Sequence, residues 1–169
     1  MSYFLNLFFV FSILGFAMEQ SLLNLFGKRY NSSLLHGPWT IVYGIATLII
    51  LFIGDKMKQL FQNKILRFCL FFVTSFLILS ILELVAGIAI EKILHITYWD
   101  YSNLPLNLGK YICVPVSLIW TVYAVILNYA LYPWLKKIIP KIPKWVTIIF
   151  VIAFIIDIIY SIYQYLLYV

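Results

Sequence analysis

Five long apolar segments, at about residues 3–25, 38–54, 66–94, 111–134 and 145–167, take up most of this 169-residue chain. A helix that crosses the hydrocarbon of a membrane needs about 20 mostly apolar residues, and these segments have that length. Apolar residues make up 64% of the chain and charged residues 11%, whereas an ordinary soluble domain is about 45–50% apolar. The sequence therefore predicts an all-α integral membrane protein, a single transmembrane domain with about five transmembrane helices.

The basic residues of the loops predict how these helices are oriented. The second and fourth loops with their flanks hold eight lysines and arginines, and the first and third hold four. Because cytoplasmic loops carry the excess of basic residues, we expect a cytoplasmic N-terminus and a C-terminus outside. The first segment lacks a basic n-region and a clear cleavage site, so we expect it to be retained as a span.

The composition also bears on location and partners. Richness in Lys, Ile, Asn and Tyr is typical of an AT-rich bacterial genome, which places the protein in a bacterial plasma membrane. The basic residues lie in short loops rather than on a folded basic face, so we expect the lipid bilayer and no nucleic acid as partner.

A shift of 72 residues reveals an internal repeat. It aligns the segment from Gly15 to Glu19 with the segment from Gly87 to Glu91, and it also aligns Asn31 with Asn103. Two predicted helices separate the copies, so both copies would have the same orientation in the membrane. We therefore expect two parallel helix hairpins, residues 3–54 and 66–134, followed by a last helix at 145–167, as in some transporters.

Carboxylates inside the apolar segments are the strongest functional signal. Glu19, Glu83 and Asp157 lie within predicted spans, where an acidic residue costs roughly 2.5–3.5 kcal/mol on insertion scales. Glu83, Gly87 and Glu91 follow one another at four-residue steps and form one stripe on a helix. This pattern predicts a polar cavity, open to the outside, in which Glu19, Glu83 and Glu91 bind a cation or polar group or exchange protons. The alternative is that these glutamates only hold helices together, which is the role we expect for Asp157.

The two predicted outward loops are dense in polar and aromatic side chains, although an interfacial belt of tryptophan and tyrosine would give part of this pattern. His36 and His95 fit interfacial positions better than metal ligands, since no short-range ligand spacing such as H-E-x-x-H is present. Motifs for binding ATP are also absent. We therefore expect neither a metal nor a cofactor. Besides the three glutamates, the candidate residues of the substrate or ion cavity are Tyr43, Trp99, Asp100, Tyr101, Ser102 and Asn107, and further candidates are His36, Asn31 and Lys110.

Several of these residues also carry a family resemblance, which covers about residues 11–134. The stripe from Glu83 to Glu91, the Trp99-Asp100-Tyr101-Ser102 block and the segment from Gly37 to Gly44 resemble the bacterial family called putative ABC-transporter type IV, or CmpB-type, permeases. Ile41 departs from the family pattern, as does Lys110-Tyr111. The resemblance implies a permease-like subunit that acts with an ATPase or another membrane subunit, or as a homo-oligomer.

Three functions follow as hypotheses. The first is a small transport subunit without enzymatic activity, in which Trp99 and Tyr101 gate a cavity lined by the glutamates while Asp100 and Asn107 fix the loop. The second is a membrane-embedded enzyme that acts on a lipid or polyprenyl-linked substrate, with a glutamate as general base and Asp100 or His36 as its acid partner. The third is a scaffold or regulatory subunit whose polar stripe docks a partner helix.

Overall fold

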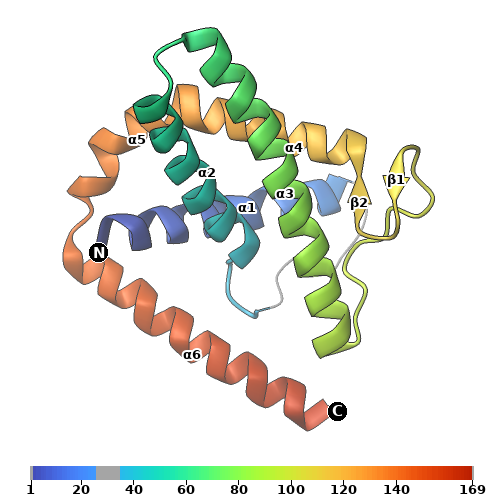
Figure 1. Cartoon of the computed structure of the whole chain (residues 1–169). Helices are drawn as coiled ribbons and strands as arrows, with labels where there is room; N and C mark the ends of the chain where they lie inside the picture. Colours follow the sequence, from blue (N-terminus) through green and yellow to red (C-terminus); the bar gives the residue numbers. More distant parts are fainter. Residues whose placement is uncertain (1, 26–34, 169) are drawn as a thin grey trace. The chain divides into compact units, whose positions relative to one another are not determined.

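The computed structural model describes residues 2–25 and 35–168, and nearly all of its regular structure is helical (Figure 1). Its main elements, in chain order, are α1 (Ser2–Leu25), α2 (Ile41–Leu60), α3 (Lys64–Leu94), β1 (Asn107–Leu108), β2 (Ile112–Cys113), α4 (Val114–Ile126), a π-helix (Leu127–Leu131), α5 (Tyr132–Ile138), a short 3-10 helix (Ile139–Lys141) and α6 (Lys144–Tyr168). The predicted helical membrane fold is confirmed. The exception is the third loop, where β1 and β2 form a small antiparallel hairpin.

Four described helical stretches are long and apolar enough to cross a membrane: Ser2–Ser21, Lys64–Leu94, Val114–Lys141 and Lys144–Leu166. The predicted second span corresponds to α2, whose last turns carry Asp55, Lys56 and Lys58. Helix α2 is not among these four stretches, and its three charges fall close together at its end, although its first 14 residues, Ile41 to Gly54, are uncharged.

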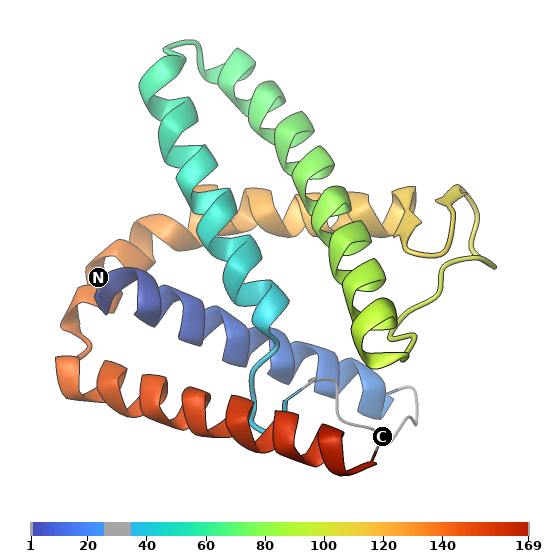
Figure 2. The ribbon, with the colours of Figure 1, turned by 60° about the horizontal axis from the view of Figure 1, so that its bottom comes forward.

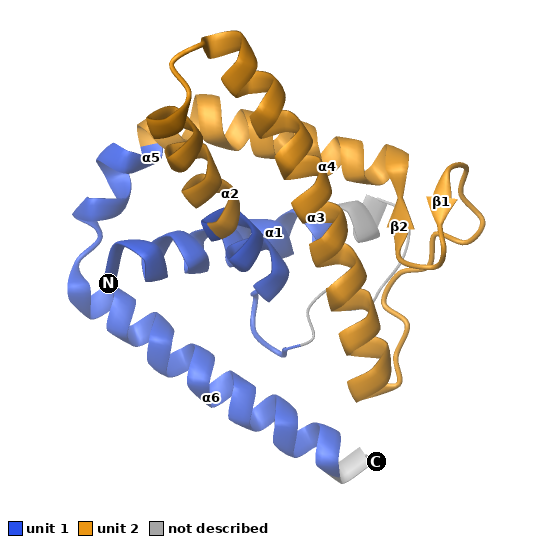
Figure 3. Cartoon of the chain, in the orientation of Figure 1, with its two compact units in different colours: residues 1–48, 135–169 blue, residues 49–134 orange. Residues whose placement is uncertain are grey.

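The chain divides into two compact units, residues 1–48 with 135–169 and residues 49–134 (Figure 3). In the first unit, α1 and α6 lie side by side and run in the same direction (Figure 2). The Thr147 hydroxyl donates to Asn6 Oδ1 at 2.7 Å, and the rings of Phe9 and Phe150 stack with centroids 5.6 Å apart. If both helices cross the membrane, the chain between them must cross it an odd number of times. Helices α3 and α4 supply two of these crossings. The shared direction of α1 and α6 therefore supports α2 as the third crossing.

In the second unit, α3 and α4 run in opposite directions. Glu83 of α3 bonds Ser117 near the start of α4, whereas Phe71, earlier on α3, contacts Tyr129 in the π-helix that follows α4. Small polar residues that are fully buried lie on both helices, Ser75 on α3 and Thr121 on α4. Small side chains of this kind let two membrane helices approach closely.

Local sequence explains where these helices begin and end. The Asn63 side chain caps α3 by accepting from the N–H groups of Ile65 and Leu66, at 3.0 and 3.1 Å. The helix ends at His95, whose φ of 54° is left-handed and whose N–H donates to Glu91 O. The π-helix after α4 directly precedes Tyr132-Pro133; Pro133 has no N–H to continue a regular helix, so a local change of helix type at this point is expected.

Candidate functional site

Glu83, half-buried on α3 in the second unit, has a carboxylate that accepts three side-chain hydrogen bonds. The Tyr101 hydroxyl and the Trp120 indole N–H donate to Oε1 at 3.2 and 3.1 Å, and the Ser117 hydroxyl donates to Oε2 at 3.2 Å. All three donors are uncharged. Among the described residues, no lysine, arginine or histidine lies within ion-pair distance of Glu83. Within the part of the chain that the structure describes, Glu83 is therefore a carboxylate with neutral partners, and it lies on a helix long and apolar enough to cross a membrane.

Ser117 and Trp120 are site residues that the sequence reasoning did not assign to the site. They stand three positions apart on α4, so they share one face of that helix, and Ser117 is fully buried. The available signal was the Ser117-x2-Trp120 spacing, which is part of the stretch that resembles the permease family. Tyr101, by contrast, was predicted, and it reaches Glu83 from the loop between α3 and α4.

One turn beyond Glu83, Gly87 gives the ring of Tyr111 room to pack on α3. A Cβ atom added to Gly87 would lie 2.5 Å from Tyr111 Cδ1, so no larger residue fits without displacing the ring. Trp99 supports the same ring in an edge-to-face contact, and its indole N–H donates to Tyr111 O at 3.3 Å. This packing holds the hairpin of β1 and β2 against α3.

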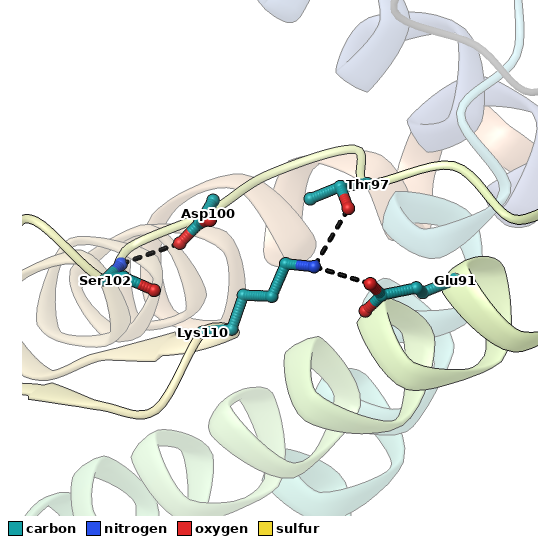
Figure 4. Close-up of polar contacts among 5 residues, drawn as sticks. All are labelled: Glu91, Thr97, Asp100, Ser102 and Lys110. Carbon is teal, nitrogen blue, oxygen red and sulfur yellow. Dashed lines mark hydrogen bonds and ion pairs between the residues drawn. The ribbon is translucent and has the colours of Figure 1, made fainter.

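A further turn along α3, Glu91 forms an ion pair with Lys110, which lies in the hairpin turn (Figure 4). Lys110 Nζ is 2.6 Å from Glu91 Oε1 and 2.9 Å from Thr97 Oγ1. It also lies 5.5 Å from the centroid of the Tyr111 ring. The side chains of Lys110 and Glu91 are 31% and 40% exposed, so this ion pair is accessible to water.

The loop between α3 and β1 is ordered by its own polar side chains. Asp100 Oδ1 accepts from Ser102 N at 2.8 Å (Figure 4), and Asn107 Nδ2 donates to Ser102 O at 3.1 Å. Hydrogen bonds from the Ser102 hydroxyl and then its backbone N–H hold the pKa of Asp100 below its ordinary value. These contacts fit a role in fixing the loop.

The first unit holds Glu19 and Tyr43, two more of the predicted site residues. The Tyr43 hydroxyl donates to Glu19 Oε1 at 2.9 Å. Its ring lies against Gly15, where an added Cβ would be 2.4 Å from Tyr43 Cδ2. The predicted partner Asn31 lies outside the described residues.

Asp157 of α6 is also in the first unit, where it ties the helix to the segment before α2. Its Oδ2 accepts from Gly37 N at 2.9 Å and from the Trp39 indole N–H at 2.6 Å. Its Oδ1 accepts from His36 N at 3.2 Å and from the Ser161 hydroxyl at 3.4 Å. This set of four donors fits the packing role that the sequence indicated. Over the described ranges, no three His, Cys, Asp or Glu side chains group as metal ligands would.

The second unit thus brings eight predicted site residues into one connected region: Glu83, Glu91, Trp99, Asp100, Tyr101, Ser102, Asn107 and Lys110. A groove of about 390 Å³ lies on α4 but is apolar and contains none of them. Its lining residues are Leu118, Ile119, Val122, Tyr123 and Ile126.

Comparison with known proteins identifies the family of the chain. Neither the curated proteins nor the solved structures contain a significant match. A family model described as "Putative ABC-transporter type IV" matches residues 6–162. That match covers most of the chain, and the apolar helices agree with it, so the chain belongs to this family of membrane transport-related proteins.

Proposed function

We propose that the protein is a permease-like membrane transport subunit in which Glu83 is the central polar site and Glu91 is the next site toward the loop. The observation that carries this proposal is the neutral surroundings of Glu83, whose three hydrogen-bond donors are a phenol, an alcohol and an indole. Acidic residues inside membrane spans usually mark ion or proton pathways.

The chemistry of the site favours a cation or a proton as the transported or coupled species. Three neutral donors orient the Glu83 carboxylate but leave its negative charge in place. A cation or a proton would neutralise that charge, and the free energy gained would be large because the surroundings are poorly solvated. An anion would meet repulsion at the same position.

The loop between α3 and α4 would then control access to Glu83. Tyr101 bonds Glu83 directly, and Trp99 supports Tyr111 above Gly87. Any movement that carries Tyr101 away from α3 removes one of the three donors and opens one side of the carboxylate. Asp100 and Asn107 would set the shape in which this loop closes.

Glu19 with Tyr43 would form a corresponding polar site in the first unit, as the predicted repeat implies. A single small chain leaves little room for a translocation path, so assembly with an ATPase, with another membrane subunit or with further copies of the chain is part of the proposal. In the predicted orientation, the end of α3 that carries Glu91 and leads into the loop would face the outside of the cell.

Replacement of Glu83 by glutamine tests the proposal because it removes the charge and preserves the contacts. Glutamine Oε1 can still accept from Tyr101 and Trp120, and its amide can donate to Ser117. In a strain that lacks the gene, E83Q should fail to restore the deletion phenotype although its level in the membrane is normal. S80A, which removes a buried hydroxyl of α3 that, among the described residues, bonds only Phe76 O in the same helix and leaves Glu83 and its donors untouched, is the matched control and should restore the phenotype.

A fully functional E83Q would contradict a role for the charge and would leave Glu83 as a structural hydrogen-bond acceptor. Reconstituted vesicles address the alternatives directly. Turnover of labelled lipid by the purified chain would indicate an enzyme, and recovery of a stable partner complex with unchanged function in E83Q would indicate a scaffold.

A further inference from the structure

Two lysines of the second unit are held in sites of the same composition. Each ammonium group meets a carboxylate oxygen, a neutral side-chain oxygen and the face of a tyrosine ring. The first is Lys110, next to Glu91, Thr97 and Tyr111. The second is Lys58 on α2, and it is not among the residues of the proposed transport site.

The site around Lys58 lies near the opposite end of α3 from Lys110. Lys58 Nζ is 3.6 Å from Asp55 Oδ1, 3.5 Å from Asn128 Oδ1 and 5.7 Å from the centroid of the Tyr132 ring. The Tyr132 hydroxyl donates to Asp55 Oδ2 at 3.0 Å. Asn128 belongs to the π-helix, a type of helical irregularity that is frequent at functional sites.

Gly54 makes this second site possible. A Cβ atom at Gly54 would lie 2.2 Å from Asn128 Oδ1, so only glycine lets the Asn128 amide approach α2 and reach Lys58. The same close approach seen between Gly87 and Tyr111 therefore recurs here with a different partner. Both sites depend on a glycine of one helix placed beside a polar or aromatic residue that borders the ammonium.

Each site includes a residue with a buried polar atom and charged side chains that water can reach. Among the described residues, Tyr111 Oη and Asn128 Nδ2 are buried polar atoms without a hydrogen-bond partner. Asn128 is 1% exposed and Tyr111 is 9% exposed. Buried groups of this kind normally have a partner: the Tyr111 hydroxyl can accept an N–H donor, whereas Asn128 Nδ2 is itself a donor and needs an acceptor. The charged side chains are about one-third exposed, at 35% for both Asp55 and Lys58, and a solute can reach them.

We propose that these are two binding sites for a primary ammonium compound, and that Lys110 and Lys58 are tethered ammonium groups that occupy them when the compound is absent. A carboxylate, a neutral oxygen and an aromatic face together suit an alkylammonium ion, which offers N–H donors and a cation for the ring. This inference rests on the proposed transport function and names its cargo class. Glu83 would lie between the two sites, about 12 Å along α3 from Glu91.

Removal of a tethered lysine should expose its site to a free competitor. The full chain, purified in neutral detergent at constant ionic strength, is titrated with n-butylammonium chloride and binding is followed by calorimetry. K110M and K58M should each bind the probe about fivefold more tightly than the unsubstituted chain. In the unsubstituted chain the probe must displace the lysine from an exposed ion pair, and such a pair lowers the apparent affinity by about that factor. K92M is the matched control: Lys92 is exposed, adjacent to Glu91, and outside both sites. It should bind like the unsubstituted chain.

Two further measurements separate the proposed site from general charge effects. Adding E91Q to K110M should abolish the gain, because the carboxylate that holds the ammonium is lost. Tetramethylammonium, which has no N–H to donate, should bind K110M more weakly than n-butylammonium. Equal binding of the two cations would overturn the assignment of a primary ammonium ligand.

The inference as a whole is overturned if K110M and K58M bind n-butylammonium no more tightly than K92M. This binding assay does not depend on transport. A functional E83Q would therefore contradict the proposed function but would not affect tighter binding of n-butylammonium by K110M. Loss of function in E83Q, together with no gain in n-butylammonium affinity in K110M, would contradict the cargo class alone.

Discussion

Truncation of Glu83 to alanine should destabilise the protein much more than replacement by glutamine. Alanine leaves the Tyr101 hydroxyl, the Ser117 hydroxyl and the Trp120 indole N–H without their acceptor. Hydrogen bonds between membrane helices contribute about 0.6 kcal/mol each on average. With all three lost, E83A should lower the free energy of unfolding by about 2 kcal/mol.

Glutamine keeps an oxygen in place of Oε1, which serves two of the three donors, and reverses the bond to Ser117. E83Q should therefore change the free energy of unfolding by less than about 0.6 kcal/mol. Reversible unfolding of the purified chain in mixed micelles, with increasing denaturing detergent, measures both values. Equal stability of E83A and E83Q would show that the three contacts contribute nothing and would refute the reasoning that this carboxylate is structurally satisfied.

Two other predictions concern Asp157 and Asp100. D157N replaces one acceptor oxygen by a donor that would face either the Gly37 and Trp39 N–H groups or the His36 N–H. It should lower the unfolding free energy by about 1–3 kcal/mol. Q164A removes one exposed hydrogen bond on the same helix, from Gln164 Nε2 to the Tyr160 hydroxyl, and should change the unfolding free energy little in the same micelle assay. Because the pKa of Asp100 is held below its ordinary value, its bond to the Ser102 N–H contributes order above that ordinary range and is lost as the pH falls through the lowered pKa. The protection factor of the Ser102 amide, which compares its exchange rate by NMR with that of an unprotected amide at the same pH, should fall at that acidic pH, and a protection factor that does not change with pH would contradict the assignment.

The sequence was sufficient to predict the helices because each one carries its own signal. Continuous apolar residues and the absence of internal proline predict α3 over most of its length, and Pro140 and Pro143 mark the turn before α6. The hairpin of β1 and β2 was not predicted. Each strand has only two residues, and Gly109 with a φ of 71° forms the turn between them. Two-residue strands have no alternating pattern that a sequence could reveal.

The contacts of the acidic residues could not be predicted, since they join residues far apart in the chain. Glu83 meets donors 18, 34 and 37 positions away, and Asp157 meets Gly37 at a separation of 120. Spacing along one helix identified the stripe of Glu83, Gly87 and Glu91, but it contained no information on the facing helix. That information depends on how α3 and α4 pack, which is decided by many weak apolar contacts at once.

The predicted repeat aligns Gly15 with Gly87, and the contacts of these two glycines can be compared, although the 72-residue shift does not relate Tyr43 to Tyr111. Gly15 and Gly87 each lie against a tyrosine ring, Tyr43 in the first unit and Tyr111 in the second. The glutamates that follow them by four residues differ in their partners: Glu19 accepts from the hydroxyl of that same Tyr43, whereas Glu91 pairs with Lys110, the residue next to Tyr111. Lys110 brings a positive charge to Glu91, whereas the Tyr43 hydroxyl brings none to Glu19. A cation that binds Glu91 must therefore displace the Lys110 ammonium group. The ammonium titration of K110M therefore measures how strongly the Lys110 cation competes with a free cation for the Glu91 carboxylate.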